Sequence, residues 1–213
     1  MPLYTTDALI LRTHRLGESD RIVVFLTRDR GKKRGVAKNA RQSRRRFGGA
    51  LEPMTYGRVG YFERERRELV SLNFVEPARS PLSALDGEAL GYVGYFAELI
   101  DEWAQEADPN ETLYRLGASM VDAMAVGVPI EPLARYFEYW LLRLQGVYEA
   151  DARLSGAARD FLAAARGVSP FALGRVVVTG ETLHELEAAH RALIAMHLEK
   201  DLKSARVLRE MRR

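Results

Sequence analysis

The sequence contains no cysteine among its 213 residues. That absence excludes disulfides and thiolate metal sites, and it makes the cytosol the default location. The sequence also has no run of about 18 uncharged apolar residues, so we expect no membrane-spanning helix. The first residues lack a basic segment followed by an apolar stretch, which argues against a secretory signal. Hydrophobic residues still make up 47% of the chain, which predicts a buried core rather than wholesale disorder.

The signatures of common enzyme classes are missing as well. Residues 31–35 (Gly-Lys-Lys-Arg-Gly) lack the glycine-rich lead and the Ser or Thr after the lysine that a P-loop requires. The sequence has no dinucleotide fingerprint, no Gly-x-Ser-x-Gly elbow and no thiol nucleophile. We therefore predict no catalytic constellation, and an enzyme of nucleic-acid metabolism is the weakest of the functional hypotheses.

Three of the four histidines, His184, His190 and His197, fall on one predicted helix. Two Glu-x-x-His pairs occur there, but a carboxylate-bridged metal site needs such pairs on different helices. We therefore predict no metal site. The pairs are interpreted as a solvated helix face, and His197 as a partly buried side chain.

The net charge of +3 conceals a division between the two parts of the chain. Residues 1–80 carry 18 Lys and Arg against 9 Asp and Glu, whereas the remainder carries 14 against 20. Such asymmetry indicates a polyanion-binding module joined to a part with another task.

The first 80 residues show the pattern of short strands separated by turns. The predicted strands cover residues 8–11, 22–26, 33–38, 55–62 and 69–75. Five strands without a convincing helix suggest a small barrel. An OB-fold is the leading candidate, because it has five strands and commonly binds nucleic acid. An SH3-like barrel fits the strand count almost as well.

Beyond Pro81 the hydrophobic period changes from 2 to 3.6, which predicts helices. The predicted helices cover residues 88–104, 108–126, 129–144, 155–166 and 181–197, with a final basic helix from Lys203. Asp108 is predicted to cap the second of them. The pattern leaves residues 174–180 unplaced. The sequence thus predicts an α+β chain, with a barrel in residues 1–80 and an all-helical domain in residues 81–213.

The densest cationic segment runs from residue 28 to residue 46. Ten cations face a single acid, Asp29. A phosphate backbone would relieve their mutual repulsion, and arginine offers a fork that matches phosphate oxygens. The alternative is a merely soluble basic face, or a patch that attracts acidic protein. The predicted DNA-binding cations are Arg28, Arg30, Lys32, Lys33, Arg34, Lys38, Arg41, Arg44, Arg45 and Arg46.

Aromatic side chains near this segment could stack on the bases of a single strand. Tyr61 and Phe62 are adjacent in a predicted strand, so they point to opposite faces and one of them belongs to the core. Phe47 lies within the basic loop, residues 39–49, which we expect to become ordered on binding. We therefore add Phe47 to the predicted DNA-binding residues, although a structural role is an equal alternative.

The residues of this first part resemble the opening of the RecO family of recombination mediators. The resemblance is carried by residues 8–12 (Ala-Leu-Ile-Leu-Arg), 17–23 (Gly-Glu-Ser-Asp-Arg-Ile-Val), 26–32 and 35–53. It continues more thinly in residues 135–146, beginning Arg-Tyr-Phe-Glu, and at residues 202–206.

The resemblance implies an N-terminal OB-fold, a helical C-terminal domain and no enzyme activity. It implies binding of single- and double-stranded DNA, annealing of complementary strands, and cooperation with RecR in loading RecA onto DNA coated by single-stranded DNA-binding protein. The acidic tail of that protein would dock on the helical domain, with Arg135 as the predicted contact. The equal alternative is that Arg135 is an ordinary arginine on a helix surface. The implied location is the cytoplasm, at the nucleoid. An RNA-binding barrel module is the alternative, because a charged barrel serves either polymer.

One feature departs from many members of that family. They insert a four-cysteine zinc ribbon after the segment corresponding to Gly146, and this chain has no cysteine. We therefore expect no zinc ribbon and no cofactor.

Overall fold

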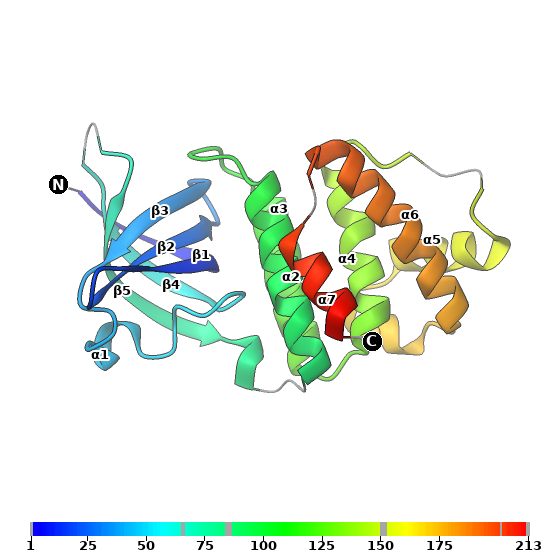
Figure 1. Ribbon diagram of the computed structural model, residues 1–213, viewed down its shortest axis with the longest axis horizontal. Helices are drawn as coiled ribbons and strands as arrows, with labels where there is room; N and C mark the ends of the chain where they lie inside the picture. The colour runs from blue at the N-terminus through cyan, green and yellow to red at the C-terminus, as the bar shows by residue number, and fades with distance from the viewer. Residues whose placement is uncertain (1, 65–66, 84–86, 150–152, 201, 212–213) are drawn as a thin grey trace.

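The protein was studied as a computed structural model that describes residues 2–64, 67–83, 87–149, 153–200 and 202–211. A five-stranded sheet comes first and helices follow, in the order that the sequence predicted (Figure 1). The strands are β1 (Leu3–Leu16), β2 (Asp20–Thr27), β3 (Lys32–Ala37), β4 (Tyr56–Phe62) and β5 (Val70–Arg79).

The sheet closes on itself in the order β1-β2-β3-β5-β4, since β1 pairs with β4 as well as with β2. Strand β3 meets β5 in a short parallel ladder of three residue pairs. The long β1 exceeds its predicted length because residues 3–7, which carry no continuous apolar run, are held by pairing with β4. Tertiary pairing therefore extends a strand whose local sequence is ambiguous.

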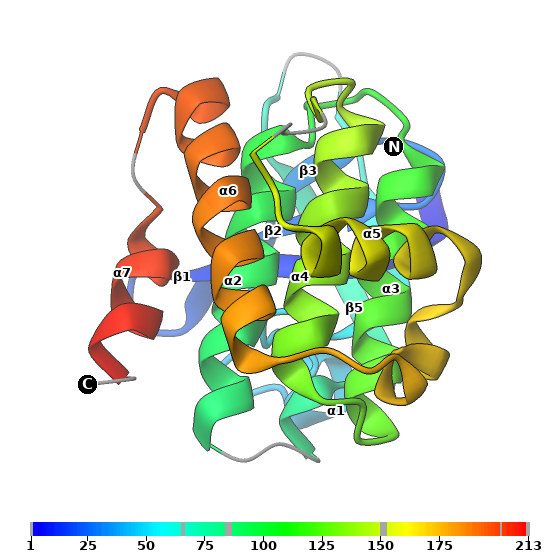
Figure 2. The same cartoon turned by 90° about the vertical axis from the view of Figure 1, so that its right-hand side faces the viewer.

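Seven α-helices and two 3₁₀ turns occur in the described part of the chain. The α-helices are α1 (Arg44–Phe47), α2 (Gly87–Trp103), α3 (Glu111–Ala125), α4 (Ile130–Leu144), α5 (Gly156–Gly167), α6 (Gly180–Leu198) and α7 (Lys203–Met211). The 3₁₀ turns are η1 (Pro81–Ser83) and η2 (Pro170–Arg175). Figure 2 shows the larger helices in front of the barrel, with α7 beside α2.

The predicted start of α3 was wrong by two residues. Asn110, not Asp108, accepts the capping hydrogen bond, from the backbone N–H of Leu113 at 2.9 Å. Asp108 lies instead against the turn at Gly31, where a Cβ would come within 2.4 Å of the Asp108 backbone nitrogen. Gly31 also has a φ of +69°. Glycine is therefore required at this turn for two reasons, a close approach and a left-handed backbone.

The buried hydrophobic side chains of the described residues form two clusters. One fills the barrel and includes Val23, Phe25 and Tyr61. The other joins the barrel to the helices, because Leu9 and Leu26 belong to the same cluster as the residues of α2, α3 and α4. Apolar contact, not a linker alone, therefore fixes the barrel against the helices.

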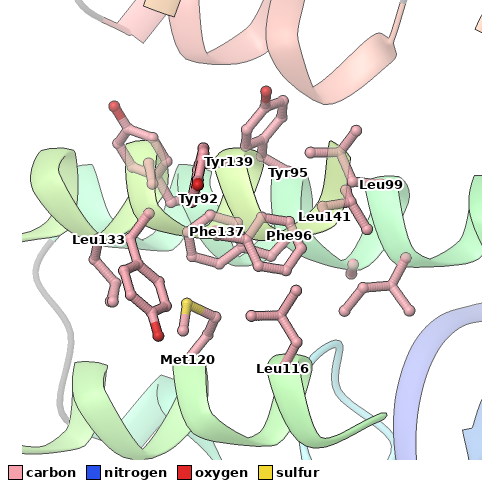
Figure 3. Close-up of a cluster of buried hydrophobic side chains, with 14 of the residues drawn as sticks. Tyr92, Tyr95, Phe96, Leu99, Leu116, Met120, Leu133, Phe137, Tyr139 and Leu141 are labelled. Atoms are coloured by element: carbon pink, nitrogen blue, oxygen red, sulfur yellow. The ribbon is translucent and has the colours of Figure 1, made fainter. Parts of the chain in front are cut away.

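The helical core is built around aromatic rings that pack at tilted or edge-on angles. The rings of Phe96 on α2 and Phe137 on α4 lie 4.6 Å apart, and Leu116 and Met120 of α3 point toward them (Figure 3). Such aromatic pairs stabilise a core beyond their area of burial. Within the described residues, no helix is both long enough and apolar enough to traverse a bilayer.

Candidate nucleic-acid interface

The cations of residues 28–46 are divided between two ends of the barrel. Strand β3 runs from a turn that faces the helices to a loop on the side of α1, away from them (Figure 1). We use the term near end for the cations that face the helices, which are Arg28, Lys32 and Arg34. We use the term far end for the cations beyond β3, which are Lys38, Arg41, Arg45 and Arg46.

Acidic side chains of the helical part neutralise the near end. The Nζ atom of Lys32 lies 2.5 Å from the backbone oxygen of Asp101 and 3.2 Å from its carboxylate. The same carboxylate pairs with Arg12 at 2.9 Å. Because the Lys32 side chain is only 15% exposed, it forms an interdomain contact and does not offer a surface to phosphate.

Arg28 and Arg34 make similar pairs nearer to solvent. Arg28 donates two hydrogen bonds to the carboxylate of Glu111, the shorter at 2.7 Å. Hydrogen bonding to Glu111, followed by its negative charge, raises the pKa of Arg28. Arg34 lies 4.0 Å from Glu106. These half-exposed pairs hold the cations in place but contribute little to stability.

The backbone of the near end is paired as well. The N–H of Lys32 donates to the oxygen of Gln105 at 3.1 Å, and the N–H of Ala107 donates to the oxygen of Lys32 at 3.2 Å. The connection between α2 and α3, which reaches back to the barrel in Figure 1, thus pairs with the edge of β3. An edge that could have added another strand is thereby covered.

Two more predicted DNA-binding cations, Lys33 and Arg30, contact acidic or aromatic side chains of the barrel itself. Lys33 donates to Glu63 at 2.8 Å and is 13% exposed. The Arg30 guanidinium lies 4.1 Å from the centre of the Tyr4 ring and 3.9 Å from the Asp29 carboxylate. Lys33 is therefore no better placed for phosphate than Lys32, whereas Arg30 keeps a half-exposed head group.

The far end is held by uncharged acceptors instead of carboxylates. Arg41 donates to the backbone oxygen of Glu18 at 2.8 Å, and Arg46 donates to that of Lys38 at 2.7 Å. Within the residues that the structure describes, no far-end cation has a carboxylate within 4.0 Å. Their charges are therefore available to an external anion. The side chain of Arg44 lies outside what the structure describes.

The loop that carries the far end is folded rather than open. The backbone N–H of Asn39 donates to the Asp20 carboxylate at 2.8 Å, and that of Arg41 donates to Ser19 at 3.2 Å. Phe47 is 2% exposed and belongs to the barrel core. The prediction that Phe47 stacks on bases was therefore wrong. Its ring anchors α1 because burial of an aromatic ring is more favourable than its exposure.

A groove of about 530 Å³ lies beside the far end. Its floor contains Val36 of β3, Ser71 of β5 and Phe62 of β4, and its rim carries the cations Lys38, Arg64 and Arg67. Among the described residues, Glu68 is the one acid in its lining. The sequence predicted that one of Tyr61 and Phe62 belongs to the core, and the structure shows that it is Tyr61. The sequence did not indicate that Phe62 lines a cationic groove.

A second cavity, of about 290 Å³, lies among α2, α4, α6 and the α7 region. Arg135 lies at this cavity and is 3% exposed. It pairs with Glu138 at 2.8 Å and with Glu187 at 3.3 Å. Burial alone would lower the pKa of Arg135, but the carboxylate of Glu138 reverses the effect, and the pKa is raised.

The Glu138 carboxylate is the centre of a buried polar network. It accepts hydrogen bonds from Tyr95 at 2.8 Å and Arg135 at 2.8 Å, and it lies 3.0 Å from Nδ1 of His190. The predicted solvated face was thus wrong for His190, which is 1% exposed, and His197 is exposed instead. Periodicity could not find this network because its members come from three helices.

Comparison with known proteins identifies the family. Models described as Recombination protein O N terminal and Recombination protein O C terminal match residues 1–81 and 84–150. A DNA repair protein RecO from Geobacter metallireducens is 33% identical over 97% of both chains. The chain belongs to the RecO family. Proteins of the same name from Koribacter versatilis and Anaeromyxobacter sp. (strain K) are 42% and 39% identical. Those matches cover 68% and 71% of this chain and 59% of each relative.

A RecO-family zinc ribbon does not fit this chain. The thiolate ligands it needs are missing, since the sequence has no cysteine. Among the described residues, no group of three or more His, Asp or Glu side chains is placed to hold a metal ion.

The sequence analysis did not include three residues of the candidate site. Phe62, Arg64 and Arg67 line the groove, and neither the cationic segment nor the RecO resemblance indicated them.

Proposed function

We propose that this RecO-family chain is a DNA-binding protein of DNA repair, without catalytic activity, that binds single- and double-stranded DNA. The observation that carries the proposal is the far end, where Arg41 and Arg46 donate to backbone oxygens and, among the described residues, no carboxylate pairs with a far-end cation. A cationic groove adjoins it. Phosphates would supply the missing counter-charges, and binding through them is independent of sequence. Location at the nucleoid follows from this role.

The proposal divides the chain into a DNA-binding barrel, residues 1–80, and a partner-docking helical domain, residues 81–213. We interpret the barrel as an OB-fold, because its five strands close in a non-sequential order and α1 lies between β3 and β4. The DNA-contacting residues are narrowed to Lys38, Arg41, Arg45 and Arg46, with Arg30 and Arg44 as further candidates. The proposal no longer includes the near-end cations Arg28, Lys32 and Arg34, or Lys33 and Phe47.

Family membership extends the proposal to annealing of complementary strands and, with RecR, to loading of RecA onto coated DNA. The cavity at Arg135 is the proposed dock for the acidic tail of single-stranded DNA-binding protein. Arg135 is already balanced by Glu138 and Glu187, so the exposed Arg191 and the nearby Arg209 are the better contacts for tail carboxylates. Arg135 would instead organise the cavity wall.

The deciding experiment is titration of the full chain with a labelled oligonucleotide at several salt concentrations. Each phosphate contact should contribute a log–log slope of about −0.7 on a single strand. Binding that is absent or insensitive to salt would overturn the proposal. Competition with an RNA of the same sequence tests the alternative of an RNA-binding module, which a strong RNA preference would establish.

A further inference from the structure

The groove beside the far end combines an aromatic floor with a cationic rim. Phe62 pairs in register with Ser71, and Ser71 pairs with Val36 on the other side, so the three residues form one row across β4, β5 and β3. The neighbours Tyr61 and Ala37 point into the barrel core. Because side chains alternate along a strand, this row faces outward.

The row continues onto a fourth strand. Leu3 of β1 pairs in register with Phe62 and is 49% exposed. The outer face of the barrel therefore presents a partly exposed aromatic ring, with Leu3 on one side and Ser71 on the other. A surface ring of this kind is a suitable platform for a flat, partly apolar group such as a nucleobase.

The cations of the rim are placed for the backbone that would accompany such a base. Lys38, Arg64 and Arg67 line the same groove, and Glu68 is the one acid among the described residues that line it. The volume of about 530 Å³ lies within the range of ligand clefts, about 300–1,000 Å³. Lys38 also belongs to the far end, so a strand held there by its phosphates would pass the groove.

We propose that this groove receives unpaired bases and that Phe62 makes the protein bind single-stranded DNA more tightly than double-stranded DNA. In a duplex the bases are stacked on each other and cannot lie on the ring, whereas a single strand can place one there. The far-end cations would bind either form. This inference rests on the proposed DNA binding and adds to it a residue that distinguishes the two forms.

The test compares Phe62→Ala with the unaltered protein, using a labelled single strand and a duplex of the same length. Loss of one base–aromatic stack should weaken single-strand binding roughly tenfold. Duplex binding should change less than about twofold, since phosphate contacts remain. Phe62→Tyr should restore single-strand binding. Phe171→Ala is the control, because Phe171 is a phenylalanine exposed to solvent on η2, in the helical part.

A second variant gives a direct signal and covers the case in which Phe62→Ala fails to fold. Fluorescence of Phe62→Trp should be quenched by an oligothymidine beyond the change seen in the unaltered protein, which has two tryptophans of its own. Equal weakening of single-strand and duplex binding, or no extra quenching, would overturn the inference. Absence of salt-dependent binding in the unaltered protein would instead overturn the proposed function.

Discussion

The near end and the far end carry the same kinds of side chain, yet the structure gives them different surroundings. At the near end Lys32 and Arg28 meet Asp101 and Glu111 of the helical part. At the far end Arg41 donates only to a backbone oxygen, and none of the far-end cations meets a carboxylate in the described structure. A count of charges along the chain is therefore not a map of an anion-binding surface. Whether a cation can bind an external anion depends on the side chains that it already contacts.

The difference also explains how one basic segment can serve two tasks. A cation paired with a partly buried acid gains little from an external phosphate, because the two anions would compete for the same donors. The near end thereby joins the barrel to the helices, together with the apolar contact at Leu9 and Leu26. The far end is left for a ligand.

The largest effect is expected on the free energy of unfolding, at Phe47, the buried ring that anchors the far end. Phe47→Ala should lower the free energy of unfolding by about 3–5 kcal/mol, because it removes a fully buried ring. Phe47→Leu, which retains most of the apolar volume, should cost less. Urea denaturation followed by circular dichroism measures both. Unchanged stability together with weaker DNA binding would show instead that the ring stacks on bases.

Next in size is the effect of removing far-end charge. Arg41→Ala with Arg45→Ala should weaken DNA binding by about 10- to 100-fold at low salt and make the log–log slope shallower by about 1.4 on a single strand. Fluorescence anisotropy at several salt concentrations gives both quantities. Arg115→Ala with Arg159→Ala is the matched control, since both arginines are exposed on the helical part. Equal weakening in the control would mean that the interface is spread over the molecule.

Much of the architecture could be predicted from the sequence because it depends on local patterns. The unbroken apolar run in β2 and the 3.6-residue period in α2 through α4 are set by neighbouring residues. The start of α3 at Glu111 was not predictable from local sequence. The preceding residues 105–107 form backbone hydrogen bonds with Lys32 of β3. That contact spans more than 70 positions in the chain.

The candidate site was predicted only in outline. The cationic segment is visible in the composition, but the division between its two ends depends on acids such as Asp101 that are distant in sequence. Phe47 and Phe62 look alike to sequence reasoning, since both are aromatic residues near cations. Only the packing of α1 against the barrel shows that the first is core and the second lines a groove.

A smaller effect, on stability alone, is expected at the near end. Asp101→Asn would leave the largely buried Lys32 ammonium without its counter-charge, which should cost about 1–3 kcal/mol of unfolding free energy. DNA affinity should remain within about twofold, since the far end is intact. Asp160→Asn, at an exposed position on α5, is the control. Thermal and urea unfolding measure the cost, and a gain in DNA affinity would mean that Asp101 masks Lys32 from DNA.

The smallest effect is expected at Arg28, and it is the sharpest test of the comparison. Arg28 and Glu111 are each about half exposed, so Arg28→Ala should leave the midpoint of urea unfolding almost unchanged. Because Glu111 already neutralises the guanidinium, DNA affinity should fall less than about twofold, in contrast to Arg45→Ala measured under the same conditions. If the two substitutions weaken binding equally, the Arg28–Glu111 pair opens when DNA binds, and the near end belongs to the interface after all. Glu111→Gln separates these cases, because it should strengthen DNA binding only if Arg28 is then released to contact phosphate.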